Sequence, residues 1–192
     1  MNKLTVIIPA YNEENYIEDA IKSVDFADQI IVIDSYSTDK TKEIAIAKGC
    51  TVIERKFDTF SNQKNHAITY AEGDWILFLD ADERVTQKLK IEILKAIQQT
   101  EFSGYKIKFV HFYFNRFLYQ KIDTVLRLVK NNDVKFTGDV HEKLIIDGKI
   151  GVLKNLMIHY TYKNLFHWLH KKDSYAWFQA GELKRKKKKV TF

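Results

Sequence analysis

The sequence of 192 residues contains one cysteine, Cys50, and one proline, Pro9. A single cysteine excludes an internal disulfide and a structural zinc site built from cysteines, and it fits a reducing compartment. No apolar run approaches the roughly 20 residues that a membrane-spanning helix needs. The first apolar run, residues 4–8, is too short for a secretory signal peptide. We therefore expect a cytoplasmic protein.

The positive charge is concentrated in one segment. The chain carries 31 lysines and arginines against 25 aspartates and glutamates, a formal net charge of +6. Six of the basic residues form a single run at 184–189 with no acid after it, which leaves 25 basic and 25 acidic residues in 1–183. A neutral body excludes a nucleic-acid-binding domain that is positive over its whole surface. We expect no nucleic-acid partner.

The first hundred residues alternate apolar runs with segments of helical period, which predicts a repeated β-α order. The run at 30–33 is apolar on both faces, as is typical of parallel strands covered by helices. The predicted strands are 4–8, 29–34, 51–54 and 75–79, and the predicted helices are 13–24, 38–48, 61–71 and 86–99.

From 104 to 162 the pattern changes to short β-branched and aromatic runs with a period of two. Asp147-Gly148 is a strong turn signal and predicts a β-hairpin between 144–146 and 149–152. No linker rich in glycine, proline or serine separates the two halves. We predict a single α/β domain with a parallel-rich mixed sheet flanked by helices, followed by a helix at 164–183 and the basic tail.

Three polar clusters directly follow predicted strands, at 9–14, 34–39 and 80–83. Ligands of open parallel α/β sheets bind outside the carboxyl ends of the strands. All three clusters are expected at that edge, so their convergence indicates a ligand site more strongly than any one of them does.

Asp80 and Asp82 are two residues apart, a spacing that points both carboxylates to the same side of an extended backbone. Magnesium and manganese bind carboxylates together with substrate phosphates, so the pair predicts a metal and diphosphate site. The alternative is a solvated acidic loop near the positive end of the helix that begins at Thr86. The position after a buried strand favours the metal site.

Asp34 ends an apolar strand, where its carboxylate can accept hydrogen bonds from a nucleobase or a ribose. The alternative is a strand-end turn, with Thr38 or Asp39 capping the next helix; we expect both. Tyr11 either packs on a base or is an ordinary exposed loop tyrosine. Because neither a Walker-type loop nor a Gly-x-Gly-x-x-Gly motif occurs, the phosphate charge has to be met by the metal and by a basic residue such as Lys64.

These segments resemble glycosyltransferase family 2, the inverting nucleotide-sugar transferases with the GT-A fold, over roughly residues 4–145. The matching segments are VIIPAYNEE at 6–14, IDSYSTDKT at 33–41 and WILFLDADE at 75–83. Within the family the sequence looks most like the lipopolysaccharide core β-glucosyltransferases. The reasons are Ser35, where most members carry a second aspartate, FSNQKNHA at 60–67 and GDVHEKL at 138–144. Members of that group usually continue well beyond the position of Phe192.

The resemblance implies a GT-A domain at 1–162, with a nucleoside diphosphate sugar bound over 1–100 and the acceptor, a saccharide or a lipid-linked one, over 101–162. It implies Mg²⁺ or Mn²⁺ as cofactor, held by Asp82 with Asp80. The implied donor-binding residues are Pro9, Tyr11, Glu13, Asp34, Lys64 and Asp80. It places the catalytic base downstream of the metal motif, at Glu142, with Asp139 as the competing candidate and His141 as a residue that orients Glu142 or bonds a carbonyl.

The chemistry agrees with a carboxylate base, because an acceptor hydroxyl has a pKa far above neutrality and needs a proton acceptor within about 3 Å. The expected activity is transfer of a sugar, a hexose such as glucose, in lipopolysaccharide or polysaccharide synthesis. A nucleotidyltransferase is an alternative, but it would usually carry a glycine-rich basic loop at 9–13. A non-catalytic nucleotide-sugar-binding module is the second alternative.

Residues 163–192 suggest a membrane contact. A helix at 164–183 is apolar on two sides, and the following basic run favours anionic lipid by about 1 kcal/mol for each charge near the surface. We predict peripheral attachment to the inner face of the plasma membrane. The alternative is a helix buried against the body.

Overall fold

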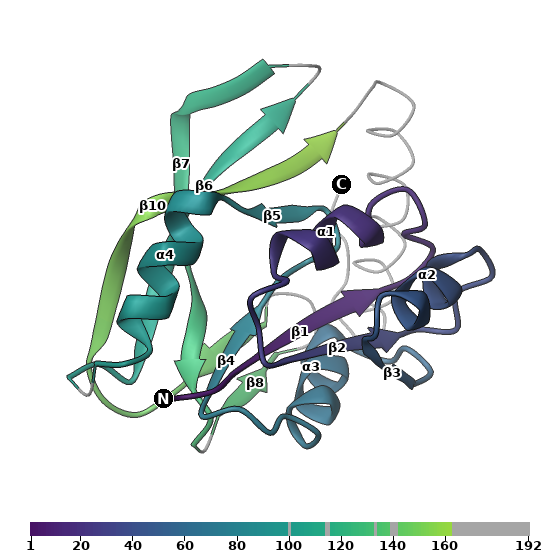
Figure 1. The fold of residues 1–192 in the computed structure, drawn as a ribbon, viewed down its shortest axis with the longest axis horizontal. Helices are drawn as coiled ribbons and strands as arrows, with labels where there is room; N and C mark the ends of the chain where they lie inside the picture. Colours follow the sequence, from purple (N-terminus) through teal and green to yellow (C-terminus); the bar gives the residue numbers. More distant parts are fainter. Residues whose placement is uncertain (100, 114–115, 133, 139–141, 163–192) are drawn as a thin grey trace, which may run out of the picture.

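The computed structural model describes residues 1–99, 101–113, 116–132, 134–138 and 142–162 (Figure 1). The first half alternates strands and helices: β1 (Leu4–Ala10), α1 (Ile17–Ser23), β2 (Gln29–Asp34), α2 (Thr41–Ala47), β3 (Thr51–Glu54), α3 (Phe60–Ile68), β4 (Trp75–Phe78), β5 (Glu83–Val85) and α4 (Gln87–Ala96). The second half is built from strands: β6 (Gly104–Tyr113), β7 (Arg116–Lys130), β8 (Lys135–Thr137), β9 (Lys143–Ile145) and β10 (Ile150–Tyr162).

The main sheet has eight strands in the order β3-β2-β1-β4-β7-β6-β10-β5, and β8 pairs with β9 in a separate small sheet. Strands β3, β2, β1 and β4 are parallel neighbours. β7 is antiparallel to β4 and β6, β10 is parallel to β6, and β5 is antiparallel to β10. The predicted fold class, an α/β domain with a parallel-rich mixed sheet, is confirmed.

Both faces of the parallel strands are covered, as their apolar runs predict. In β2, Val32 packs into the core cluster that contains residues of α1 and α4, whereas Ile31 and Ile33 pack into the cluster that contains Ala67 of α3. All three strand residues are fully buried. Because both faces of these strands are buried, the loops that follow their carboxyl ends are the part of this region that can reach a ligand.

Two predicted helices begin later than expected, because the backbone amides before them bond to another loop. α1 begins at Ile17 rather than at residue 13, and the amides of Asn12 and Glu13 donate to Ser37 Oγ and Thr41 Oγ1 at 2.9 and 2.7 Å. α2 begins at Thr41 rather than at residue 38. The helical period of the sequence does not show that these amides form hydrogen bonds to a distant segment.

The predicted hairpin at Asp147-Gly148 is wrong. Gly148 does turn the chain, with φ of 103°, but β9 pairs with β8 while β10 pairs with β6 and β5. The turn therefore separates two sheets instead of joining two paired strands. The short strand β5, which the sequence analysis did not predict, supplies the edge partner of β10.

Several expectations lie outside the described residues: the C-terminal helix, the basic run, Asp139 and His141. Among the helices of the described ranges, none is long and apolar enough to cross a membrane.

Candidate active site

The polar clusters after β1 and β2 are tied together at the carboxyl edge of the sheet. Asn12 has a positive φ of 55°, which asparagine tolerates better than most residues. Its backbone amide donates to Ser37 Oγ at 2.9 Å, and its Oδ1 accepts from the amide of Thr38 at 2.8 Å. The two loops therefore form one unit, as their expected convergence predicts.

Asp34 and Asp39 organise the second loop. Asp34 is fully buried; its carboxylate accepts from the amide of Ser37 at 2.8 Å and from the Ser37 hydroxyl. Asp39 accepts from the amide of Thr41, the first residue of α2, at 3.0 Å. Partial burial raises the pKa of Asp39, but the hydrogen bonds from Thr41 and Glu14 outweigh it and leave that pKa below its usual value. The N-cap residue of α2 is Lys40, which makes no side-chain cap bond, so neither Thr38 nor Asp39 holds the predicted cap position; Asp39 binds the first helical amide from one residue earlier.

The remaining residues predicted for the nucleoside lie beside this unit. Pro9 is half-buried in β1 opposite Ile33, and the amide of Glu13 bonds to Thr41. The side chain of Tyr11 is 59% exposed at the mouth of the first loop. Their contact with a nucleoside stays a prediction.

Asp80 joins a buried ion cluster through Arg127 of β7. One nitrogen of the guanidinium, NH2, donates to Asp80 Oδ2 and to Glu83 Oε1, both at 2.8 Å. The amide of Asp80 donates to Glu83 Oε2 at 2.9 Å. Partial burial raises the pKa of Asp80, but the charges of Arg127 and Lys64 outweigh it and hold that pKa well below its usual range. The buried Glu83 behaves oppositely: desolvation and the nearby carboxylates raise its pKa to about 7 against the pull of Arg127.

Asp82 pairs with His159 of β10, the strand next to β5 in the sheet. Nε2 of His159 in β10 lies 3.3 Å from Asp82 Oδ2, and the Asp82 side chain is only 10% exposed. Burial lowers the pKa of His159, but the bond to Asp82 and the charges of Glu83 and Asp80 outweigh it and raise that pKa. The register pairs His159 with Glu83 in β5, so the edge strand places both groups beside Asp82.

Lys64 and Glu142, predicted as the diphosphate-binding lysine and the base, are in direct contact. Lys64 Nζ donates to Glu142 Oε1 at 2.9 Å and lies 3.9 Å from Asp80 Oδ1. The Lys64 side chain is 5% exposed and stands 5.1 Å from the ring centre of Phe136 in β8. A helix and the small sheet thus bring the candidate base beside the carboxylates that follow β4.

The oxygen ligands of this site are of the kind that binds a divalent cation. The ion pairs link four carboxylates, those of Asp80, Asp82, Glu83 and Glu142, to two permanently charged side chains, Lys64 and Arg127, and to His159. The pKa of Glu83 is raised to about 7 and that of His159 is raised as well, so positive and negative charges nearly balance in this cluster. The carboxylate oxygens are nevertheless the kind of ligand that Mg²⁺ and Mn²⁺ prefer. Within the described ranges, no group of three or more Asp, Glu, His or Cys side chains is placed to hold an ion by itself.

Sequence reasoning gave no role to Glu83, Arg127 or His159. The sequence around Arg127 does indicate a special role, because Arg127 is the one charged residue in the apolar run 125–129. Its Nε is buried without a hydrogen-bond partner among the described atoms. His159 has no comparable signal, because its role depends on β5 and β10 lying side by side.

The mixed sheet, with carboxylates beyond the carboxyl ends of its parallel strands, has the layout of the GT-A fold. The sequence model described as Glycosyl transferase family 2 matches residues 5–161. The chain therefore belongs to glycosyltransferase family 2 and is a transferase, as the motifs at 6–14, 33–41 and 75–83 predict.

Individual relatives agree with the family. An uncharacterized glycosyltransferase of Rickettsia bellii is 31% identical, over 97% of this chain and 69% of its own length. One from Rickettsia typhi is 29% identical, over 100% of this chain and 71% of its own length. The crystal structure of S. aureus TarS 1-349 is similar with a TM-score of 0.51 and 26% identity, over 57% of this chain and 36% of that one. The chain thus spans about 70% of the two curated relatives and little more than a third of the TarS structure.

Proposed function

We propose that this protein transfers a hexose such as glucose, with inversion, from a nucleoside diphosphate sugar to a saccharide or lipid-linked acceptor of the cell envelope, in lipopolysaccharide or polysaccharide synthesis. The observation that carries the proposal is the row of Glu142, Lys64 and Asp80, joined at 2.9 and 3.9 Å. It sets a candidate base beside the carboxylates that follow β4. The resemblance to the lipopolysaccharide core group supports the choice of sugar and acceptor.

The donor occupies the carboxyl edge of β1, β2 and β4. Asp82 and Asp80 hold Mg²⁺ or Mn²⁺ together with the diphosphate. Bound there, the cation supplies positive charge against the departing diphosphate. Lys64 faces the same carboxylates and adds a second positive charge. The carboxylate oxygens of Asp80 and Asp82, directly after β4, support this assignment.

The nucleoside lies over the two tied loops. Tyr11 packs its exposed ring on the nucleobase, and Pro9 and Glu13 line the first loop. Asp34 accepts a hydrogen bond from the nucleobase. The bonds that Asp34 accepts from Ser37 hold the second loop in shape for that contact. A loop that is already held in shape binds a nucleoside with little further loss of conformational freedom.

Glu142 is the base. Its Oε1 is held by Lys64, which orients the carboxylate. It takes the proton of the acceptor hydroxyl while the oxygen forms a bond to the anomeric carbon. The bond from that carbon to the diphosphate breaks with its electron pair on the leaving oxygen. Attack from the face opposite the leaving group inverts the anomeric centre in one displacement. Asp139, the competing base candidate, lies outside the described residues.

The test is a thermal-shift panel of nucleotide sugars with manganese and with chelator, followed by product analysis. We expect one donor to raise the melting temperature only with the metal, and turnover to release a nucleoside diphosphate. Release of pyrophosphate would favour a nucleotidyltransferase. Donor binding without transfer to any acceptor would indicate a binding module.

We also propose that the protein works in the cytoplasm at the inner face of the plasma membrane, where a lipid-linked acceptor would be found. The basic run at 184–189 supports this location by its charge. Loss of vesicle binding on neutralising that run is the expected result, and undiminished binding would contradict it.

A further inference from the structure

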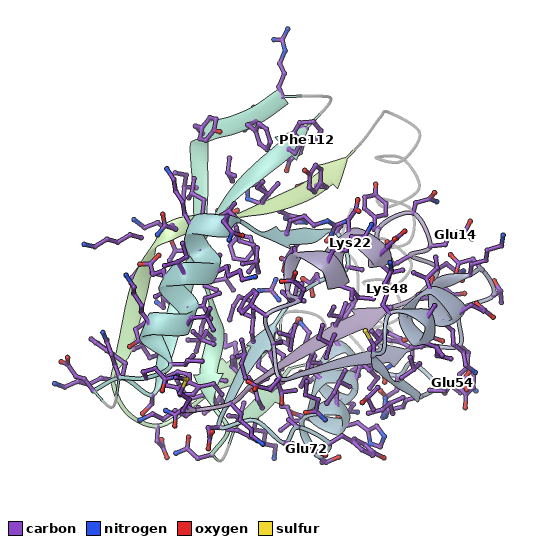
Figure 2. The ribbon with its side chains drawn as sticks, in the orientation of Figure 1. Glu14, Lys22, Lys48, Glu54, Glu72 and Phe112 are labelled. Atoms are coloured by element: carbon purple, nitrogen blue, oxygen red, sulfur yellow. The ribbon has the colours of Figure 1, made fainter. Side chains whose placement is uncertain are left out.

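Four aromatic side chains form a cluster where β6, β7 and β10 reach beyond the rest of the protein (Figure 1). Phe112 lies opposite Phe117 in the β6–β7 register, and their ring centres are 4.9 Å apart. Tyr160 of β10 contacts Phe112 at 5.2 Å, and Tyr119 contacts Phe117 at 6.0 Å. We call these four residues the aromatic tip; Figure 2 labels Phe112 near its end.

The aromatic tip is open on the side of β7. The exposed fraction is 39% for Phe117 and 62% for Tyr119. Large rings that stay in contact with one another and with water form a continuous apolar patch, which isolated surface aromatics do not. The patch belongs to none of the groups that we place at the donor, the metal or the base.

The strands that carry the aromatic tip lack acidic residues over long stretches. The sequence from 102 to 122 contains four lysines and arginines and no aspartate or glutamate, and 148–162 contains two lysines and again no acid. Lys106 and Lys108 lie an even number of residues before Phe112 in β6, so they share its face of the sheet. The nearest acid in these strands is Asp123 of β7, which bonds Nε2 of His111 at 2.8 Å. The strands of the aromatic tip thus combine exposed aromatic rings with more basic than acidic residues.

We propose that the aromatic tip docks on the surface of an anionic phospholipid bilayer. Tyrosines such as Tyr119 and Tyr160 favour the boundary between headgroups and acyl chains, and phenylalanines beside them bury their rings at that boundary. Lysines and arginines next to them gain from the negative surface potential of such lipids. This contact is separate from the basic run at 184–189 and does not depend on the proposed transfer reaction.

The arrangement of the rings favours lipid over a single-stranded nucleic acid. Nucleobases stack on separate ring faces arranged along a positive groove. Here the single ring of Phe112 contacts the ring of Phe117 at an interplanar angle of 59° and the ring of Tyr160 at 62°. Side chains that pack against one another present an apolar edge for insertion into an interface, and they leave few faces for stacking.

The test uses the full chain with phosphatidylcholine vesicles, alone or mixed with an equal amount of phosphatidylglycerol. We expect binding to the anionic vesicles, weakened about tenfold by Phe117→Ser combined with Tyr119→Ser. The matched control replaces two exposed isoleucines of the body, Ile46→Ser with Ile91→Ser, which are 55% and 50% exposed; its binding should equal that of the wild type. Circular dichroism and the melting temperature check the fold, and Tyr119→Gln is the milder variant.

The contribution of the tail is separated by repeating the series in a chain whose six basic residues at 184–189 are replaced by glutamine. The tip substitutions should still weaken binding in that background. Equal binding of the tip variant and the control would overturn the proposal. Three other results would also overturn it. A tip variant that changes only oligonucleotide binding indicates a nucleic acid as the occupant, and one that changes only the sedimentation mass indicates a second copy of the chain. A variant that changes only the melting temperature indicates the chain's own C-terminal segment.

Discussion

Lys64 donates to Glu142 at 2.9 Å, across 78 residues of sequence, and reaches within 3.9 Å of Asp80. One buried lysine therefore connects the candidate base with the carboxylates that follow β4. Because Lys64 is nearly inaccessible, its partners are set by the fold and not by solvent exchange. From these contacts of Lys64 we predict one effect on catalysis and another on stability.

Glu142→Gln should abolish sugar transfer, because the amide accepts no proton. We expect a loss of about 10²–10⁴ in kcat, with donor affinity nearly unchanged. Initial rates and donor titrations measure the two effects. Glu72→Gln, an exposed acid on the loop before β4, is the control and should keep full activity. Unchanged turnover of Glu142→Gln would rule out its role as base.

Lys64→Met should destabilise the fold by about 3–5 kcal/mol, because it leaves the partly buried carboxylate of Glu142 without its cation and Asp80 with Arg127 alone. Urea unfolding measures the change. Combining it with Glu142→Gln should recover part of the loss, since the second change removes one of the orphaned charges. If the two single effects simply add, the ion pair carries no coupling energy.

Asp82→Asn should weaken donor binding only when the metal is present. Titration of the donor with manganese and with chelator gives the two affinities for wild type and variant. We expect the difference between the two conditions to shrink by about tenfold or more. The metal role fails if wild-type donor affinity does not respond to magnesium, manganese or chelator.

Arg127→Met removes the guanidinium that bonds both Asp80 and Glu83. Glu83 is 1% exposed, so we expect a loss of about 3–5 kcal/mol in the free energy of unfolding. Arg127→Lys should recover only part of it, because a flexible lysine stem does not fix a single donor between the two carboxylates as the planar guanidinium fixes NH2. Denaturant titration of both variants measures the difference, and equal stability of the two would show that charge alone matters.

Glu92 of α4 gives a pH dependence away from the site. Its carboxylate accepts from the amides of Lys154 and Asn155 at 2.8 and 2.9 Å; burial raises its pKa, but these bonds outweigh it and lower that pKa. A lowered folded-state pKa stabilises the protein above the unfolded value, and the contribution is lost as pH falls through the folded value. Glu92→Gln should therefore cost about 1 kcal/mol at neutral pH, with the gap to wild type closing in acid.

Urea unfolding of both proteins at neutral pH and at several acidic values measures that gap. Glu101→Gln is the control, because the Glu101 side chain is 63% exposed and lies 3.7 Å from Lys149; it should change little at any pH. A difference for Glu92→Gln that stays constant with pH would exclude a titration of Glu92.

The position of each strand and helix of the first half was largely predictable, because those elements have a period that local sequence carries. Predicted strands at 29–34 and 51–54 match β2 and β3. Helix starts were less predictable, because the backbone amides of Asn12 and Glu13 donate hydrogen bonds to Ser37 and Thr41, which lie 25 and 28 residues away in the sequence. The Asp147-Gly148 turn was found, but its pairing was not, because a period of two does not identify the neighbouring strand.

The sequence by itself determined the α/β class, the family and the polar clusters at the strand ends, since burial of apolar runs on both faces leaves chemistry only at the carboxyl edge. Only the tertiary structure decided how the charges pair: Lys64 with Glu142, Arg127 with Asp80 and Glu83, and His159 with Asp82. The physical reason is that an ion pair depends on which strands and helices become neighbours. In this sheet β7 enters beside β4, and β10 lies next to β5, which no local pattern specifies.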